Sequence, residues 1–238
     1  QWDKVAAVRD QLPNLKHIVT MRGTTIDDPM TITWDDFQAK GIDGGEQVEA
    51  DIHNLNPDDN ATFIYTSGTT GPPKAVMLSH ENLAWTGKLA MQLIDQDEND
   101  CALSYLPLSH IAEQMFSIHA PISSGGQVYF AESVEKMPDN LKEVQPTVFF
   151  GVPRVWEKFH AGVATKLKLA TGVKKILVDF ARRTGTEVTT KKNAGEPISG
   201  MLAIRYKLAN KLIFSKLKPA LGLGRARMCV SGAAPIAP

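Results

Sequence analysis

The sequence predicts an α/β protein with mainly parallel βαβ-type sheets flanked by helices. Between residues 61 and 152, short apolar runs of strand length alternate with stretches of helical spacing, which is typical of βαβ units. Hydrophobic residues make up 43% and charged residues 22% of the 238 residues, which is enough apolar material for a sizeable core. No apolar run approaches the roughly 20 residues that a bilayer-spanning helix needs.

The first part of the chain predicts a few short elements and then a connection. A short helix opens the chain, residues 15–21 (LKHIVTM) form a strand, and residues 33–41 (TWDDFQAKG) form an amphipathic helix that ends at Gly41. From residue 41 to residue 59 the composition turns to Gly, Asp, Asn and Pro, which predicts a surface connection.

The remainder alternates strands with helices and then becomes mostly helical. Ser79 is a candidate N-cap for a helix from 81 to about 94. A region rich in Lys, Arg, Leu and Ala, residues 155–217, predicts two or three helices interrupted by a polar loop at 189–197. The other predicted elements are strands at 61–66, 75–79, 101–108, 127–131 and 147–152, helices at 109–122 and 140–145, and a last strand with a tight turn within 225–235.

Charge and cysteine content exclude some classes of function. Lys plus Arg and Asp plus Glu number 26 each, so the formal net charge is zero and gives no electrostatic reason to expect a nucleic-acid partner. Cys101 and Cys229 lie far apart without metal-ligand spacing, and we interpret them as reduced thiols of a cytoplasmic protein.

The most informative segment is a loop of hydroxyl and glycine residues between two predicted strands, TSGTTGPPK at 66–74. Glycines allow the backbone N–H groups to approach a polyphosphate, hydroxyls add donors, and a lysine adds positive charge. The Walker pattern is excluded, because Lys74 is followed by Ala75 where that pattern has Ser or Thr. The candidate phosphate-binding residues are Thr66, Ser67, Gly68, Thr69, Thr70, Gly71 and Lys74.

This loop resembles the phosphate-binding signature of the adenylate-forming, or AMP-binding, superfamily, which includes acyl-CoA synthetases, luciferases and peptide-synthetase adenylation domains. Most members have glycine after the lysine, and Ala75 fits if its backbone stays at negative φ. The resemblance implies that the loop at 65–74 holds the β- and γ-phosphates of ATP, with Thr66 as a candidate Mg²⁺ partner.

A second segment, YLPLSHIAEQ at 105–114, is similar to the x-P-x-x-H motif of acyl-CoA synthetases. The resemblance implies that His110 lies beside the acyl carboxylate and acts in catalysis; the alternative is that His110 only caps the helix that follows. In some long-chain members an aromatic residue just after this histidine gates the acyl tunnel. Here the corresponding residues are Ala112, Glu113 and Gln114, so no such gate is visible.

Two further segments, GVPRVWEKF at 151–159 and SGAAP at 231–235, extend the resemblance to long-chain acyl-CoA synthetases, closest to the bubblegum type and its bacterial relatives. In that family these segments line the acyl and adenine pockets. The resemblance therefore implies pocket roles for Gly151, Val152, Gly232, Ala233 and Ala234. For each of them, a turn glycine or packing alanine is the alternative.

The implied activity is ATP-dependent activation of a long-chain fatty acid to acyl-adenylate and then acyl-CoA, with ATP, Mg²⁺ and coenzyme A as cofactors or substrates. Family segments that follow SGAAP are not found in these 238 residues, including a metal-binding glutamate and a C-terminal domain with a catalytic lysine. We therefore expect residues 1–238 to be an incomplete N-terminal adenylation domain with a helical insertion at about 155–217, inactive alone.

Two other functions stay open at this point. An aryl-acid or amino-acid adenylating enzyme would keep the superfamily, but the Lys-rich helical stretch favours the long-chain synthetases. A catalytically silent acyl- or nucleotide-binding fragment would change the class. The basic face formed by Lys166, Lys168, Lys174, Lys175, Arg182 and Arg183 is either a solvated helix face or a peripheral contact with an anionic membrane.

Overall fold

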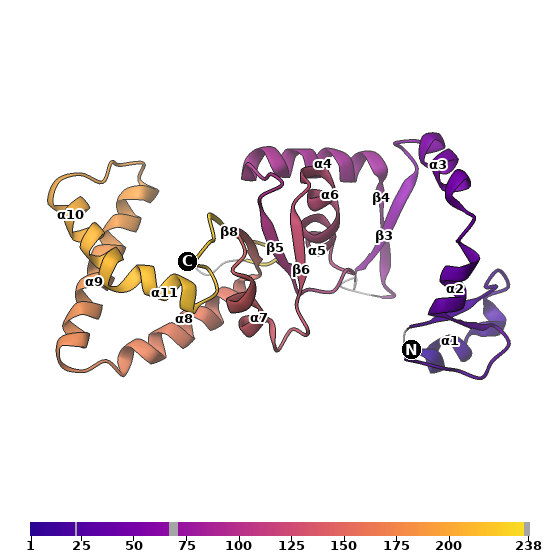
Figure 1. The fold of residues 1–238 in the computed structure, drawn as a ribbon, viewed down its shortest axis with the longest axis horizontal. Helices are drawn as coiled ribbons and strands as arrows, with labels where there is room; N and C mark the ends of the chain where they lie inside the picture. The colour runs from indigo at the N-terminus through magenta and orange to yellow at the C-terminus, as the bar shows by residue number, and fades with distance from the viewer. Residues whose placement is uncertain (22, 67–70, 236–238) are drawn as a thin grey trace. The chain divides into compact units, whose positions relative to one another are not determined.

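The computed structural model describes residues 1–21, 23–66 and 71–235, and the chain divides into two compact units, Gln1–Asp59 and Asn60–Pro238 (Figure 1). Short strands and helices alternate through both units, so the predicted α/β class with mainly parallel pairing is confirmed.

The first unit contains a two-stranded parallel sheet and short helices. Its sheet pairs β1 (Ile18–Thr20) with β2 (Thr31–Thr33), and an ion pair of 2.6 Å joins Arg9 to Asp28. The Thr33 side chain accepts a hydrogen bond from the Asp36 N–H and so caps α2. The helices of this unit are α1 (Trp2–Ala6), the 3₁₀ helix η1 (Arg9–Gln11), α2 (Trp34–Lys40) and α3 (Gly45–Asn54).

Helix α3 corrects one prediction, because residues 41–59 were expected to be a connection without regular structure. Gly41, Asp43 and Gly44 lie before the helix and Gly45 is its first residue, and the sequence from Glu46 to Asn54 contains no proline or further glycine to break it. The turn composition therefore marks only the two ends of this segment.

The second unit begins with a hairpin and continues as alternating strands and helices. Its strands are β3 (Asn60–Thr66), β4 (Lys74–Ser79), β5 (Cys101–Ser104), β6 (Gln127–Phe130), β7 (Val148–Gly151) and β8 (Met228–Ser231). Its helices are α4 (His80–Ile94), α5 (Ile111–Gln114), the π-helical η2 (Met115–His119), α6 (Ala120–Ser124), α7 (Met137–Val144), α8 (Pro153–Lys168), α9 (Gly172–Asn193), α10 (Gly200–Ala209), the π-helical η3 (Asn210–Phe214) and α11 (Ser215–Ala220).

Two parallel two-stranded sheets, β5 with β6 and β7 with β8, contact each other through β5 and β7. Strand β5 pairs with β6, and β7 pairs with β8, with Gly151 opposite Ser231. The Thr147 N–H donates to the Cys101 carbonyl over 3.0 Å, which places β5 beside β7. Cys101 contacts Thr147 at the beginning of these strands and Tyr105 contacts Val152 after their ends, so β5 and β7 run in the same direction. The carboxyl ends of both pairs therefore lie on one side, as in sheets whose ligands bind at that edge.

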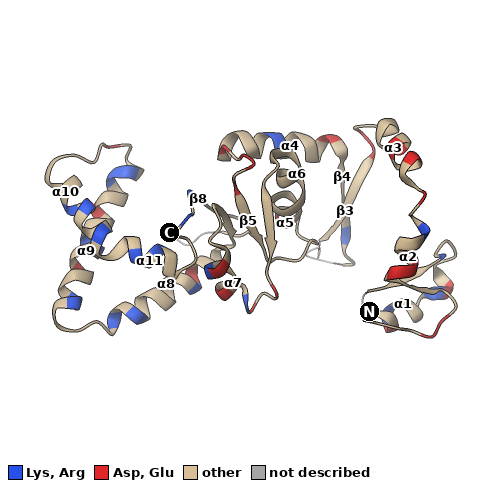
Figure 2. Ribbon diagram, in the orientation of Figure 1, with Lys and Arg blue, Asp and Glu red and all other residues tan. Residues whose placement is uncertain are grey.

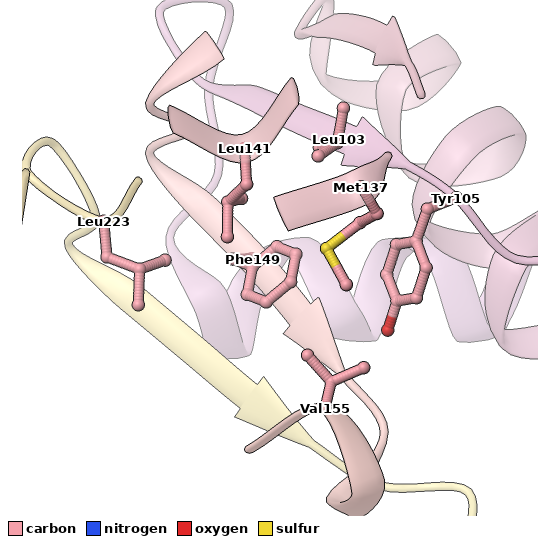
Figure 3. Packing of buried hydrophobic residues seen from close by; sticks show 7 residues of the cluster. All are labelled: Leu103, Tyr105, Met137, Leu141, Phe149, Val155 and Leu223. Carbon is pink, nitrogen blue, oxygen red and sulfur yellow. The ribbon is translucent and has the colours of Figure 1, made fainter. Parts of the chain in front are cut away.

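Helices cover both faces of β5 and β7, as expected for parallel strands. On one face Leu103, Tyr105 and Phe149 pack with residues of α7 and α8, including Met137 and Val155 (Figure 3). On the other face the helix formed by α5, η2 and α6 contacts β5, and α4 covers that helix. Alternate strand residues thus face different helical layers.

A polar cluster joins the amino ends of the same strands. The Asp100 carboxylate accepts hydrogen bonds from Arg227 and, over 2.6 Å, from Thr147 Oγ1. The Arg227 guanidinium also donates to the carbonyls of Ile94 and Asp95. The hydrogen bond from Arg227 is the main reason that the pKa of Asp100 falls to about 2, against the opposing effect of burial.

The helical region after β7 has more helices than the sequence predicted. The prediction of two or three helices between 155 and 217 is wrong, since α8, α9, α10 and α11 all lie there in whole or in part. The loop expected at 189–197 begins later, because α9 continues through Thr189 and Lys192 to Asn193. In the described part of the chain, no helix is both long enough and apolar enough to cross a membrane.

Candidate functional site

The candidate phosphate loop connects the two strands of an antiparallel hairpin. Thr66 ends β3 opposite Lys74, which begins β4, and the Thr66 hydroxyl approaches the Lys74 carbonyl at 3.5 Å. Both residues are exposed. The pairing holds the two ends of the loop together, so that a hydroxyl and an ammonium group flank its opening.

Gly71 has φ +98°, a backbone conformation that residues other than glycine rarely adopt, and the space around it is open. Ser67, Gly68, Thr69 and Thr70 lie outside the described residues. Ala75 is paired with Tyr65 within the hairpin and is not among the residues with positive φ. The methyl group that distinguishes it from the family's glycine therefore causes no backbone strain.

His110 occupies the N-cap position of α5, with φ −95° and ψ 125°. Its imidazole is exposed and makes no capping hydrogen bond to the helix. The position is thus the one that the capping alternative required, but the side chain does not perform that role. The ring is available for a ligand.

The two predicted wall segments lie next to each other at the carboxyl ends of β7 and β8. Gly151 is the register partner of Ser231, and Val152 and Gly232 follow on their respective strands. The Phe150 ring stacks on Phe116 of η2 with centroids 4.8 Å apart. A Cβ atom added at Gly232 would lie 3.5 Å from the Phe150 ring.

Gly151 has no room for a side chain. An added Cβ would lie 2.8 Å from the Trp156 indole, whose Nε1–H donates to the Gly151 carbonyl over 2.9 Å. Trp156 in turn meets the rings of Phe149 and Phe159 edge-on. The candidate wall at Gly151 therefore needs a glycine for packing.

The turn after β8 contains a strained residue. Ala233 has φ +66°, in the left-handed region that alanine seldom occupies, and Ala234 beside it is exposed. The Ser231 hydroxyl is buried and has no hydrogen-bond partner among the described residues. An unsatisfied hydroxyl and a strained turn at one strand end are features of a binding wall.

Direct contacts join the His110 segment to this wall. The Tyr105 hydroxyl accepts a hydrogen bond of 3.3 Å from the Val152 N–H, and burial raises the pKa of Tyr105. The stack of Phe116 on Phe150 provides a second link. The phosphate hairpin adjoins the same group through α4, which contacts both β4 and η2.

Sequence reasoning missed four residues of this arrangement: Tyr105, Glu113, Phe116 and Trp156. Phe116 is an aromatic residue on the helix that follows His110, a little beyond the three positions where an aromatic gate was sought. Glu113 is only 3% exposed, which no local pattern indicated, since a glutamate on a helix is ordinarily solvated. His119, on the same helical stretch, is partly buried, and burial lowers its pKa.

The described residues do not make a metal site by themselves. Among them, no three His, Cys, Asp or Glu side chains gather to hold an ion. Thr66 supplies one hydroxyl oxygen beside a lysine. A Mg²⁺ ion usually keeps several waters and takes its other ligands from substrate phosphates. These residues therefore fit a metal that arrives with a nucleotide and do not fit a resident ion.

A family model described as "AMP-binding enzyme" matches residues 2–238. The chain belongs to this family. The chain is 40% identical over 250 residues to the long-chain-fatty-acid–CoA ligase ACSBG2 of Xenopus laevis. This alignment covers 99% of the chain and 33% of the relative. The chain is also 39% identical to the human ACSBG2 over 99% of this chain and 36% of the relative. The chain thus spans about a third of the length of these curated relatives.

One solved structure has a similar fold. The anthranilate CoA ligase AuaEII, in complex with anthranoyl-AMP, aligns with 64% of this chain and 29% of its own chain at a TM-score of 0.52 and 20% identity. At that identity the likeness concerns the fold alone. The bubblegum-type resemblance expected from YLPLSHIAEQ and GVPRVWEKF is confirmed by the whole-chain matches to ACSBG2 and ACSBG1.

Proposed function

We propose that this chain is part of an ATP-dependent long-chain fatty acid–CoA ligase. The observation that carries the proposal is the similarity to proteins named long-chain-fatty-acid–CoA ligase, which extends over 99% of the chain at 40% identity and includes every candidate site segment. The geometry supports it, because a hydroxyl- and lysine-flanked loop, an exposed histidine and a wall of small residues are brought into one unit.

In the first step a fatty acid carboxylate attacks the α-phosphate of ATP and releases pyrophosphate. Thr66, Gly71 and Lys74, with the residues between them, hold the β- and γ-phosphates and offset their charge as the leaving group departs. Mg²⁺ bound to the nucleotide would supply further charge neutralisation, and the Thr66 hydroxyl would be one oxygen ligand for it. His110 donates a hydrogen bond to the acyl carboxylate or to the oxygens of the acyl phosphate.

In the second step the thiol of coenzyme A attacks the acyl-adenylate and expels AMP. For both steps the chain also provides a wall against which flat or linear groups lie. Gly151, Val152 and Gly232 keep side-chain bulk away from the strand ends, and Ala233 and Ala234 continue the wall at the turn. The Phe116–Phe150 stack next to this wall supports a role in contacting an alkyl chain.

ATP–pyrophosphate exchange with fatty acids of increasing chain length tests the proposal. The protein made from the complete reading frame that contains these residues should exchange, with the highest rate for long chains. Lys74→Ala should lower that exchange by about 100-fold or more, as expected for removal of a cation from a phosphoryl-transfer site. The matched control is Lys88→Ala, an exposed lysine on α4.

Each alternative gives a different result in the same assay. Exchange with benzoate-like or amino acids and none with any fatty acid would contradict the fatty-acid proposal and favour the other adenylating enzymes. Nucleotide binding without exchange would favour a silent binding module. Assayed by themselves, the 238 residues are expected to give no exchange, because they span only about a third of the length of the curated relatives.

A contact with an anionic membrane surface, from a cytoplasmic location, is the second part of the proposal. Leu169, Val173 and Ile176, around the turn between α8 and α9, have side chains that are 68–77% exposed. Figure 2 shows lysines and arginines on both sides of this turn. From residue 158 to residue 178 the chain has six basic or histidine residues and no Asp or Glu. Apolar side chains among lysines suit insertion at a headgroup boundary.

A further inference from the structure

A buried glutamate lies at the start of the helix that His110 begins. The Glu113 carboxyl group is a hydrogen-bond acceptor for three donors: Ser104 Oγ at 2.5 Å and Ser117 Oγ at 2.6 Å on Oε1, and the Leu106 N–H at 3.2 Å on Oε2. The residue is 3% exposed. None of the ion pairs among the described residues includes it. The carboxyl group is thus held by hydrogen bonds alone.

Two of these hydrogen bonds reach the chain that leads to His110. Glu113 accepts hydrogen bonds from Ser104 at the end of β5 and from the Leu106 N–H. The neighbouring Gln114 donates from Nε2 to the Leu108 carbonyl over 2.8 Å. The His110 N–H then donates to the Pro107 carbonyl over 3.0 Å. The loop is fixed along its length, while the imidazole at its end stays exposed and makes no capping bond.

The same short segment also contacts the candidate wall. Tyr105 lies between Ser104 and Leu106, and its hydroxyl accepts the hydrogen bond from the Val152 N–H. Its ring stacks on Phe149 in the core, with centroids 6.0 Å apart. Residues 104–106 therefore join two parts of the site: Glu113 attaches them to the His110 helix, and Tyr105 attaches them to the turn after β7.

We propose that Glu113 is a positioning residue, which sets the place of the His110 imidazole relative to the wall at Gly151 and Val152. A carboxyl group inside the protein is costly unless its oxygens accept hydrogen bonds, and the hydrophobic face of this helix already has apolar residues for packing. What Glu113 adds is a fixed geometry for the loop. Catalysis that depends on positioning is sensitive to errors of about 1 Å in such a support.

The proposal rests on the role of His110 in the proposed function, and a double-mutant cycle tests it in the complete enzyme. Glu113→Ala should lower kcat for pyrophosphate exchange by about 10- to 100-fold and leave KM for ATP unchanged, because the phosphate hairpin is untouched. The combined variant with His110→Ala should lose no more than His110→Ala alone, because Glu113 acts through His110. Additive losses, or full activity of Glu113→Ala, would overturn the proposal.

Two conservative variants separate geometry from charge and from general stability. Glu113→Gln can accept from the Leu106 N–H through its carbonyl and donate to both serine oxygens, so it should recover most of the activity lost in Glu113→Ala. Ser117→Ala removes the one hydrogen bond that does not reach the loop and should behave as the wild type does. Inactivity of Glu113→Gln in a folded protein would mean that charge, not position, is what the site needs.

A spectroscopic measurement keeps the inference separate from the proposed function. The His110 imidazole resonances should shift or broaden in Glu113→Ala and keep their positions in Ser117→Ala; unchanged resonances in Glu113→Ala would overturn the inference whatever the activity. If Glu113→Ala does not fold, Gln114→Ala removes the second support of the loop and should move the same resonances. Absence of exchange by the wild-type enzyme with every acid would refute the ligase function alone.

Discussion

Single residues at the strand ends decide the shape of the candidate pocket. Gly151 lies against the Trp156 indole, which leaves no space for a methyl group. Ala233 holds a left-handed conformation that costs an L-residue roughly 1–2 kcal/mol. Both are among the residues predicted as pocket walls: Gly151 ends β7, and Ala233 lies in the turn after β8, the strand that pairs with β7. The local backbone, more than any long side chain, therefore forms this wall.

The variant Gly151→Ala measures how tightly the wall is packed. The added methyl group must displace the Trp156 ring, and we expect the free energy of unfolding to fall by about 1–3 kcal/mol. Chemical denaturation followed by tryptophan fluorescence would report both the loss and the moved indole. Gly162→Ala is the matched control: Gly162 lies in α8 with open space around it, so alanine there should raise stability by about 0.5–1 kcal/mol. Equal effects of the two variants would contradict this account.

The residues that sequence alone could predict are those with local signals. The hydroxyl- and glycine-rich loop, the histidine that begins a helix and the small residues after two strands all stand in short contiguous motifs. Glu113 could not be predicted, because its three donors come from a strand, a loop and a later turn of its own helix. The roles of His110 and of the wall residues stay predictions until they are measured.

At the scale of elements, the connection between α8 and α9 combines exposed apolar side chains with several lysines. Leu169, Val173 and Ile176 expose their side chains to solvent, where apolar residues gain nothing from folding. Lysines at 166, 168, 174 and 175 surround them. A solvated helix face would account for the lysines but not for three exposed aliphatic side chains among them. This combination is why we favour the membrane contact over the solvated face.

Vesicle flotation tests the membrane contact. The protein should bind vesicles that contain phosphatidylserine and bind neutral phosphatidylcholine vesicles weakly. Lys174→Glu with Lys175→Glu should reduce binding by about 30-fold or more, at about 1 kcal/mol for each lysine near the surface. Val173→Ser with Ile176→Ser should reduce it by about tenfold through lost apolar burial.

A matched charge change elsewhere controls for net charge. Lys40→Glu with Lys88→Glu alters two exposed lysines on α2 and α4 and should leave vesicle binding unchanged. Equal binding of the wild type to neutral and anionic vesicles would refute the contact. So would an effect of the control pair as large as that of the pair at the turn.

Elements were predicted well where strand and helix patterns alternate cleanly and less well elsewhere. The hairpin strands, the Ser79-capped helix and the strands β5 to β8 appear where the apolar runs stand. Helix α3 was missed because Gly and Asp residues at its borders dominate the composition of that stretch. Helix α9 continues through Thr189 and Thr190 because its Val188 is buried, and such tertiary burial overrides weak local propensity.

At the scale of the second unit, its parallel strands are fixed at one end and carry the candidate site at the other. Asp100 joins three strand beginnings through Thr147 and Arg227, whereas the predicted wall lies at the carboxyl ends of the same strands. The partners of Asp100 are far away in the sequence, so no local motif could predict them. As the pH falls, protonation of Asp100 should weaken this polar cluster before the packed core is affected.

The Asp100 cluster makes stability depend on pH in a defined window. The pKa of Asp100 is 3.8 in its ordinary state and about 2 in the fold, so its contribution is complete above about pH 4 and is lost as the pH falls through about 2. We expect this single group to account for about 1–2 kcal/mol, since solvent reaches Arg227 and screens the pair.

Denaturant unfolding at several pH values checks the expectation. Between pH 4 and pH 2 the free energy of unfolding should fall more steeply for the wild type than for Asp100→Asn. At neutral pH the variant should already be less stable, because Arg227 has lost its carboxylate partner. Asp179→Asn, a change at an exposed carboxyl on α9, should keep the wild-type slope. Parallel slopes for the wild type and Asp100→Asn would show that this cluster does not set the acid response.

The pairing of β7 with β8 has a consequence for the order of events during protein synthesis. Val148 lies beside Met228, and the helices α8 to α11 are all encoded between them. On the ribosome, β7 emerges before its partner β8 and stays unpaired on that side while those helices are synthesised. The wall at Gly151 and Gly232 is therefore completed after them, and the exposed edge of β7 depends meanwhile on local helices for protection against wrong pairing.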